Sequence, residues 1–352
     1  MRSPALLFGI PIEDVTMDEC VTLVGRLVAV GRATSSTQQV ATVNVDFLVN
    51  ALLDHALHTN LRNASLCAAD GAPVLWGARW LGTPLRERVA GVDLVSALAA
   101  SSASNGLRIH LFGSREGSAE RAAQLLRERH PGANVTGDSG PMVRDVRDTP
   151  ESVLRSIEEL DPDVLCVALG NPKQEQWIAA HRDRLRTPVM IGVGGTVDFL
   201  VGHRRRAPMW VQRIGLEWLV RAAQEPARLG RRYAKDAIVY FPRLARAAFA
   251  QRRWREGASI TVDPPEAPAD PVTVRAVRMG GLPAGAMPDG ADGWFEHGSV
   301  LELQFSDEPL LDVAALAQVA GLARLARRWG REVRIDAPRG SMRDQLAQLG
   351  LG

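Results

Sequence analysis

Polar side chains that could bind a substrate follow directly on a strongly apolar segment of this sequence. The stretch 169–178, LGNPKQEQWI, places Asn171, Lys173, Gln174 and Glu175 immediately after the apolar run DVLCVA. Amide and carboxylate groups at such a point can hydrogen-bond the edge of a uracil or the hydroxyls of a sugar. The same pattern also suits a local role, with Gln174 capping a helix and Lys173 in solvent.

A carboxylate occupies a second strand-to-helix turn, in the stretch CAADGAPVLWGARWLG. Asp70 stands there beside Gly71 and Pro73, which shape the backbone before an apolar helix. An aspartate at this place can cap the helix. It can also act as a general base that takes a proton from an attacking hydroxyl.

Three further segments could bind phosphate or a sugar. Arg86 and Arg88, in PLRERVAGVDLV, are either solvated or placed to bind a diphosphate. The segment 111–122, LFGSREGSAERA, resembles a phosphate cradle at a helix N-terminus, although it has neither GxGxxG nor a P-loop lysine. Thr196 and Asp198, in GVGGTVDFLVG, follow another apolar run and either cap a helix or bind the ligand.

No metal and no cofactor are predicted. The DPD stretch at 161–163 mimics a DxD metal motif but precedes its strand, away from the edge where ligands bind. The seven histidines show no ligand spacing. Cys20, Cys67 and Cys166 lie far apart in apolar surroundings, which indicates reduced thiols in a cytosolic protein.

The elements that would position these residues alternate between apolar strands and amphipathic helices from about residue 5 to 200. Continuous apolar strands predict an α/β fold with a Rossmann-like parallel sheet and helices on both faces. The loops after the strands should then gather at one edge. The segment 39–52 is expected to begin as a strand and to pass into a helix near Asp46. Further strands are expected at 108–113, 163–170 and 188–195, with a short strand and turn at 133–140, and further helices at 114–130, 149–160 and 172–185.

The charge of the chain is unevenly distributed. Residues 203–255 contain 14 Lys and Arg against three Asp and Glu, a net of +11, whereas the remainder has 28 basic and 37 acidic residues. This block is expected to be helical, with breaks near 224–230 and 240–244. Arginines interleaved with Trp, Leu and Ile favour docking on an anionic membrane, with no nucleic acid as partner.

Four parts of the chain follow from these patterns. Residues 1–202 are the Rossmann-like domain, 203–256 a basic amphipathic helical appendage, 257–271 a linker, and 272–352 a small α/β domain. No window is long and apolar enough to span a membrane. We therefore expect a cytoplasmic protein that is peripheral on the inner face of the cytoplasmic membrane.

Residues from about 5 to 255 resemble the WecG/TagA/CpsF family of bacterial glycosyltransferases. The resemblance rests on GNPKQE followed by RAPMWVQRIGLEWLVRAAQEPARLGRRY, together with TVNVDFLVNA and ADGAPVLW. It implies inverting, metal-independent transfer of a sugar from a UDP-sugar to a polyprenyl-diphosphate-linked saccharide. The donor would be of the UDP-N-acetylmannosamine or UDP-glucose type.

The resemblance also implies roles for individual residues. Asp70 matches the proposed catalytic base, and Thr42 and Asn44 match a polar pair that lines the pocket. Further residues match substrate-contacting positions or arginines thought to fold over the diphosphate: Arg88, Gln174, Arg221, Arg228 and Arg231.

The C-terminal residues resemble a STAS domain, a small interaction module. The Ser that such domains can phosphorylate is absent after Asp312, so docking of a protein partner is favoured over a phosphoswitch. A passive stabilising role is the alternative. A UDP-sugar-binding regulator that signals through this domain is the alternative to an enzyme.

Overall fold

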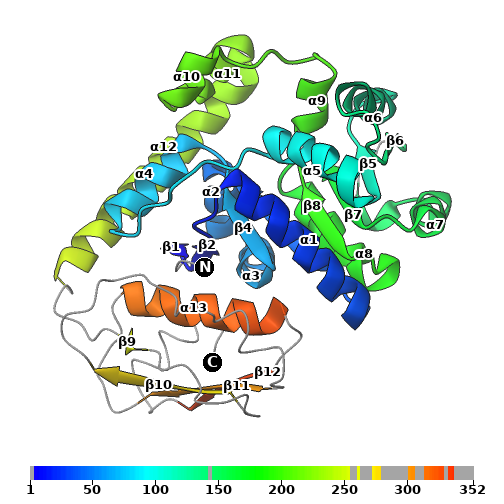
Figure 1. Cartoon of the computed structure of the whole chain (residues 1–352). Coiled ribbons are helices and arrows are strands. Elements are labelled where there is room, and N and C mark those ends of the chain that lie inside the picture. The colour runs from blue at the N-terminus through cyan, green and yellow to red at the C-terminus, as the bar shows by residue number, and fades with distance from the viewer. Residues whose placement is uncertain are drawn as a thin grey trace.

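A six-stranded parallel sheet forms the centre of the computed structural model, which describes residues 4–141, 145–253, 260–261, 272–278, 300–305, 313–328 and 332–336 (Figure 1). The strand order β4-β3-β8-β7-β5-β6 departs from sequence order, as crossover helices require. The predicted Rossmann-like parallel sheet is confirmed. Its strands are β3 (Gln38–Val43), β4 (Leu66–Ala69), β5 (Ile109–Gly113), β6 (Val135–Asp138), β7 (Val164–Ala168) and β8 (Val189–Gly192).

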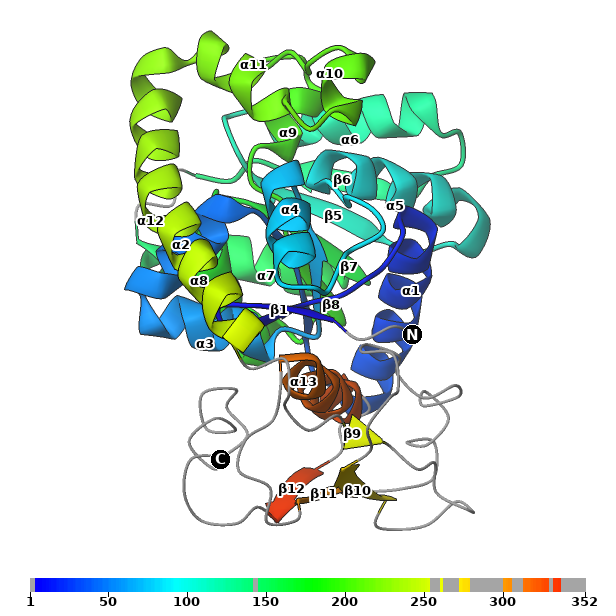
Figure 2. The same ribbon diagram turned by 90° about the vertical axis from the view of Figure 1, so that its left-hand side faces the viewer.

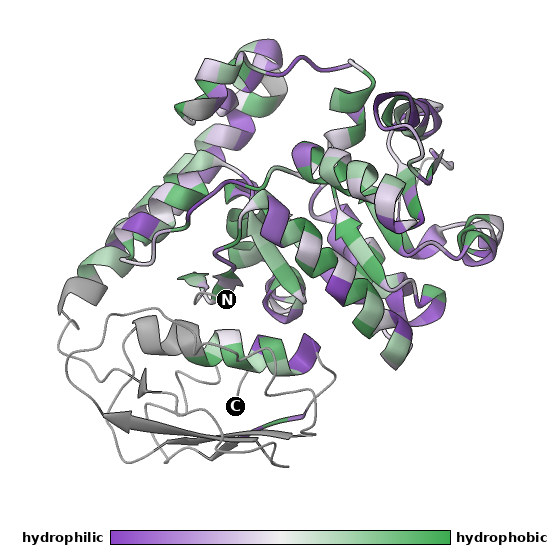
Figure 3. Cartoon of the chain, in the orientation of Figure 1, coloured by the Kyte–Doolittle hydropathy of each residue, from purple (hydrophilic) through white to green (hydrophobic). Residues whose placement is uncertain are grey.

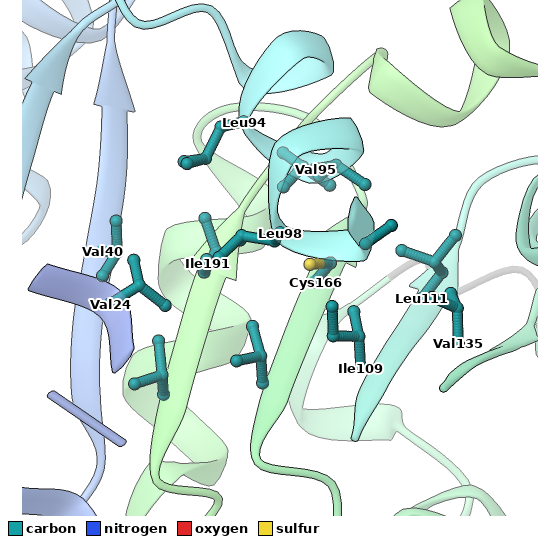
Figure 4. Packing of buried hydrophobic residues seen from close by; sticks show 14 of the residues in the cluster. Val24, Val40, Leu94, Val95, Leu98, Ile109, Leu111, Val135, Cys166 and Ile191 are labelled. Atoms are coloured by element: carbon teal, nitrogen blue, oxygen red, sulfur yellow. The ribbon is translucent and has the colours of Figure 1, made fainter. Parts of the chain in front are cut away.

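Helices cover both faces of the central strands, and residues of both faces are therefore buried. In β7, Val164 and Cys166 pack into one cluster of buried residues, and Leu165 and Val167 pack into another on the opposite face. Figure 4 shows the first cluster, which the sheet shares with α1 (Met17–Thr34), α5 (Gly91–Asn105) and α6 (Ser118–Arg129).

Other helices and a short hairpin cover the second face. The hairpin pairs β1 (Ala5–Leu7) with β2 (Ile10–Ile12) in antiparallel fashion, and the sequence patterns did not predict it. The helices are α2 (Val45–Leu53), α3 (His55–Asn63), α4 (Ala72–Trp80), α7 (Glu151–Leu160) and α8 (Lys173–Leu185), with a 3-10 turn η1 (Val146–Asp148).

The basic segment is helical, as predicted, but its breaks differ. Helix α9 (Thr196–Leu200) precedes it, and the segment itself comprises α10 (Met209–Arg213), α11 (Glu217–Gln224) and α12 (Pro226–Arg253). The break near residue 225 is confirmed. The predicted break near Pro242 is wrong, because α12 continues through this proline. Proline removes its own amide donor and its ring crowds the carbonyl four residues earlier, but Tyr240 and Leu244, on either side of it, are buried in the core and hold the helix.

Packing ties α12 to the first domain. Tyr240 and Leu244 are buried in the cluster that contains the β1–β2 hairpin. The Tyr240 hydroxyl donates a hydrogen bond of 3.0 Å to the Pro73 carbonyl, and its ring lies 5.6 Å from that of Phe8 at nearly a right angle. Figure 2 shows α12 running along the side of the molecule next to α2 and α4.

The C-terminal residues form a second sheet with the order β12-β11-β10-β9. Its strands are β9 (Ile260–Thr261), β10 (Val272–Arg278), β11 (Val300–Phe305) and β12 (Glu332–Asp336), beside helix α13 (Val313–Arg328). The predicted strand–strand–helix–strand order is confirmed. The predicted linker is corrected at 260–261, which pair with β10. The predicted final helix lies outside the described residues.

Helix α13 lies between this sheet and the first domain (Figure 1). Arg324 and Arg328, both buried, form ion pairs with the buried Glu13 at 2.8 and 2.7 Å. Arg324 also donates to the carbonyls of Leu61 and Arg62 at the end of α3. None of the helices in the described part of the chain is long and apolar enough to cross a bilayer.

Candidate active site

The loops at the carboxyl ends of the parallel strands surround a pocket of about 520 Å³. This is where a parallel α/β sheet places its ligands. The structure brings nine of the predicted site residues to this pocket: Thr42, Asn44, Asp70, Asn171, Lys173, Gln174, Thr196, Asp198 and Arg221. Ser114 and Arg115, in the segment 111–122 that the sequence analysis predicted as a phosphate cradle, line it as well, and so does Ser139, which the sequence analysis had not selected.

A second, smaller pocket of about 160 Å³ adjoins the first. Its walls are aromatic, with Trp76 from α4 and Trp218, Tyr233 and Phe241 from α11 and α12. Five residues line both pockets: Asn44, Asp46, Asp70, Arg221 and Arg232. A polar pocket and an aromatic pocket therefore meet at two carboxylates, two arginines and an asparagine.

Asp70 follows β4, and its backbone amide donates a 2.8 Å hydrogen bond to the Val43 carbonyl at the end of β3. Gly71, with φ of +122°, is the N-cap of α4, and no side chain caps this helix. The helix-capping interpretation of Asp70 is therefore wrong, and its carboxylate faces the two pockets. Burial raises the pKa of Asp70, and the charges of Arg221 and Arg88 oppose this shift.

Glu217 organises the arginines near Asp70. Its carboxylate accepts from Arg88 at 2.6 Å and pairs with Arg221 at 3.2 Å. Burial raises the pKa of Glu217, but Arg221 and Arg88 outweigh this and hold the pKa below its usual value. Arg88 lines the second pocket, and Arg221 lines both and lies 4.6 Å from the ring centre of Phe199.

Gln174 braces two loops of the first pocket. Its Oε1 accepts hydrogen bonds from the amides of Gly170 (3.2 Å) and Gly194 (2.8 Å), which follow β7 and β8. Its Nε2 donates to Glu175 Oε1 at 2.8 Å. The interpretation of Gln174 as a helix cap is wrong, because no side chain caps α8 and Gln174 bonds to the loops after β7 and β8 instead. The side chain also lines the pocket.

Glu175 corrects the expectation of direct ligand contact. It is fully buried and does not line the pocket. Its Oε2 has no hydrogen-bond partner among the described residues, and burial raises its pKa to about 8, against the opposing hydrogen bond from Gln174. The Glu175 side chain therefore helps to fix Gln174 by accepting its hydrogen bond, and it is mostly protonated at pH 7.

Three other predicted residues hold the backbone around the pocket. The Asn44 side chain caps α2 by accepting from the Phe47 amide at 3.3 Å. The hydroxyls of Thr42 and Thr196 donate to the carbonyls of Gly192 and Val193, at 3.4 and 2.7 Å. These bonds link β3 and the loop after β8 at the pocket floor.

Asp198 anchors cations at the pocket rim. It pairs with Arg204 at 3.3 Å and with Arg115 at 3.6 Å. Both arginines line the first pocket. Asp198 therefore positions positive charge near the space where an anionic ligand would lie.

The C-terminal arginines differ from the expectation. Arg231 is exposed and lines neither pocket, whereas its neighbour Arg232 lines both and lies 3.9 Å from Asp46. The side chain of Arg228 lies outside the described part of the structure. A helical spacing of four could have identified the inward face of α12, because Arg232, Asp236, Tyr240 and Leu244 follow one another at this interval.

Asp46, which the sequence analysis missed, connects the two pockets with the loop after β7. Its Oδ2 accepts a 3.1 Å hydrogen bond from Asn171. The position of Asp46 in the first turn of α2 made it resemble an ordinary N-terminal acidic residue. Only the approach of α12 shows that it faces a ligand pocket.

The interpretation of the DPD stretch as structural is supported. Asp161 and Asp163 pair with Arg32 and Arg108 before β7, away from both pockets. Across the described residues, no group of three or more His, Cys, Asp and Glu side chains is arranged to hold a metal ion.

Comparison with known proteins extends the resemblance noted in the sequence. The model of the Glycosyl transferase WecG/TagA/CpsF family matches residues 5–254. The N-acetylglucosaminyldiphosphoundecaprenol N-acetyl-beta-D-mannosaminyltransferase of Staphylococcus aureus strain MRSA252 is 29% identical over 242 residues, which cover 68% of this chain and 92% of that protein. The protein of the same name from strain MW2 is 28% identical over the same shares. The chain therefore belongs to the WecG/TagA/CpsF family of glycosyltransferases.

Proposed function

We propose that this chain transfers a sugar from a UDP-sugar, with inversion and without a metal, to a polyprenyl-diphosphate-linked saccharide in cell-surface polysaccharide biosynthesis. One observation carries the proposal: Asp70 lies where a polar pocket meets an aromatic pocket, and Arg221 and Arg232 line both. A transferase needs two substrate sites that share one reacting centre. The two pockets supply this arrangement.

The donor would occupy the larger pocket. Its volume of about 520 Å³ lies within the range of cofactor and substrate sites. Glycines 170, 194 and 195 allow close approach of the backbone. Arg115, Arg204 and Arg221 supply positive charge for a diphosphate. The donor sugar, of the N-acetylmannosamine or glucose type, is a proposal from the resemblance and from the names of the relatives.

The reaction follows from the position of Asp70. Its carboxylate takes the proton of the acceptor hydroxyl, and the hydroxyl oxygen forms a bond to the anomeric carbon of the donor sugar. The bond between that carbon and the β-phosphate oxygen breaks, and UDP leaves with the electron pair. Arg221 and Arg232 stabilise the charge that develops on the leaving diphosphate. A single displacement of this kind inverts the anomeric centre.

The acceptor would occupy the aromatic pocket. Trp76, Trp218 and Phe241 line this pocket and are also 39%, 37% and 37% exposed. The pocket wall is thus continuous with apolar surface. A lipid-linked saccharide could place its sugar beside Asp70 while its polyprenyl chain runs along that surface.

Membrane docking by the basic helical segment is part of the proposal. Met209 and Trp210 on α10, and Ile214 at its C-terminal cap, are 65%, 66% and 53% exposed. Figure 3 shows hydrophobic and hydrophilic residues interspersed along α10–α12. Exposed arginines that include Arg205 and Arg243 would each add about 1 kcal/mol of attraction to an anionic leaflet.

For residues 272–352 we propose a STAS-like domain that binds a protein partner. The order β10, β11, α13, β12 and the parallel pairing of its strands support this. The buried pairs of Arg324 and Arg328 with Glu13 indicate that the domain is docked on the enzyme rather than tethered.

The transfer reaction is tested by incubating the full chain with a panel of UDP-sugars and a short-chain lipid-diphosphate N-acetylglucosamine, with released UDP and product mass as readouts. Acceptor-dependent UDP release from one UDP-sugar supports the proposal. Tight UDP binding without product on any lipid-linked acceptor would favour the regulatory alternative.

Membrane docking is tested by co-sedimentation with vesicles that contain anionic lipid. Truncating α12 would remove Tyr240 and Leu244 from the core, so a double substitution of exposed residues, Trp210→Ser with Ile214→Ser, is preferable. We expect it to weaken sedimentation at least tenfold. Leu160→Ser, an exposed apolar residue on α7, is the control, and equal binding of both variants would remove α10 from the docking surface.

A further inference from the structure

Asp236 is a buried carboxylate on the inward face of α12. It is only 4% exposed, yet it lines the aromatic pocket together with Tyr233 and Phe241. Its Oδ1 has no hydrogen-bond partner in the described part of the chain. A buried carboxylate oxygen without a partner lowers stability. Its presence at a pocket wall therefore indicates a partner that binds from outside.

Two other buried carboxylates are paired with arginines, whereas the buried Glu175, whose Oε2 also lacks a partner among the described residues, lines neither pocket. Glu13 accepts from two arginines, and Glu217 holds two more. Around Asp236 the nearby charges are Asp46, Lys235 and Arg232, and burial followed by Asp46 raises the pKa of Asp236 to about 6. Lys235 donates to Asn50 instead. At pH 7 Asp236 is mostly an ionised group that can only accept hydrogen bonds.

The surroundings of Asp236 define the kind of ligand that fits. Trp76 and Trp218 offer flat apolar faces, and Asp70 and Asp236 offer hydrogen-bond acceptors in the same pocket. A sugar ring has these two properties together, with apolar C–H faces and hydroxyl donors at its edge. A purely apolar chain would leave both carboxylates unpaired.

We propose that Asp236 is a specificity-determining residue for the acceptor, accepting a hydrogen bond from a hydroxyl of the acceptor sugar while another hydroxyl of that ring faces Asp70. This inference rests on the proposed function and adds the recognition of a particular hydroxyl. Because the bond would be to a charged group, its loss should weaken acceptor binding by about 10- to 100-fold.

The experiment measures binding of short-chain lipid-diphosphate N-acetylglucosamine and its monodeoxy analogues by calorimetry, with UDP at saturation. The proteins are the full chain and its Asp236→Ala and Asp236→Asn variants. Lys235→Ala is the matched control, because Lys235 is the neighbouring residue on α12, is exposed and lines neither pocket. Thermal melting is recorded for each variant.

We expect one monodeoxy analogue to bind the unsubstituted protein about 10- to 100-fold more weakly than the parent sugar, and Asp236→Ala to bind both equally. UDP affinity should not change, and the melting temperature should stay the same or rise, since an unpaired buried carboxylate has been removed. Lys235→Ala should behave as the unsubstituted protein.

Unchanged acceptor affinity in Asp236→Ala would overturn the role of Asp236, and so would a continued preference of this variant for the parent sugar over its monodeoxy analogue. Neither result would contradict the proposed function. A melting temperature that drops in both Asp236 variants would show a structural role instead. If the unsubstituted protein binds UDP but neither binds nor glycosylates any lipid-linked sugar, the proposed function and this inference both fail.

Discussion

Two carboxylate sites at opposite ends of strand β4 differ in how their charges are satisfied. Near the start of β4, Glu13 accepts from the Cys67 amide and from Arg324 and Arg328, all in the interior. Just past its end, the Asp70 carboxylate faces two pockets, one of which Asp236 also lines, and the Asp236 Oδ1 has no partner among the described residues. A buried carboxylate that is paired with arginines, such as Glu13, joins parts of the fold. A pocket carboxylate without such pairing, such as Asp70 or Asp236, marks a place where a substrate could bind.

The sharpest way to break this comparison is to neutralise Asp70. Asp70→Asn keeps the shape of the side chain but removes the base, so we expect turnover to fall by about 10²- to 10⁴-fold. UDP affinity should remain, measured by calorimetry. The melting temperature should stay or rise because burial raises the pKa of Asp70, so its ionised form lowers stability at neutral pH. Unimpaired transfer would remove Asp70 from the mechanism.

Substitution of Glu13, at the other end of β4, should lower stability and leave turnover nearly unchanged, which is the opposite of what we expect for Asp70. Glu13→Gln leaves two buried arginines without their counter-charge, and we expect a loss of about 3–5 kcal/mol in the free energy of unfolding. The turnover of the folded protein should be nearly unchanged. Denaturant titration measures the effect, with Glu332→Gln, at an exposed pair with Arg334, as control. A loss equal to that of the control would contradict the structural role.

Glu217 is intermediate between Glu13 and Asp70, because it is paired with arginines, as Glu13 is, but lines a pocket, as Asp70 does. Glu217→Gln loosens Arg88 and Arg221, and we expect kcat/KM to fall about 10- to 100-fold through misplacement of the arginines. Glu151→Gln, on a surface pair with Arg184, should leave kcat/KM unchanged. An unchanged value for both variants would show that neither arginine needs Glu217.

The smallest expected effect on activity concerns Glu175. Its pKa of about 8, raised from 4.5 by burial, means that the folded state holds a proton which the unfolded state releases above pH 4.5. Stability of the unsubstituted protein should therefore decline between about pH 4.5 and 8 and then level off. Glu175→Gln should lack this decline and keep normal turnover at pH 7. Parallel melting curves of the two proteins across this range would contradict the assignment.

Strand and helix patterns predicted the parallel sheet well, because most central strands are rich in apolar residues on both faces. The same patterns placed Asp70, Asn171 and Thr196 at the correct edge, because parallel strands end together there. Thr42 and Asn44 were identified only through the resemblance to a family. They failed where a residue's role depends on a distant segment. The pairing of Arg324 with Glu13 joins residues 311 positions apart, and no local periodicity carries this information.

The sequence by itself determined the fold class and the edge of the sheet where the candidate site lies, since these follow from hydrophobic periodicity and from residues next to strand ends. It determined the family through the motifs GNPKQE and RAPMWVQRIGLEWLVRAAQEPARLGRRY. Only the tertiary structure decided that Glu175 is sealed beneath Gln174, that Arg232 rather than Arg231 faces the pockets, and that Asp236 lies within one of them. The rotation of a helix about its axis is set by what it packs against. For α12 that partner is the first domain, which buries Tyr240 and Leu244 and thereby turns Arg232 and Asp236 inward.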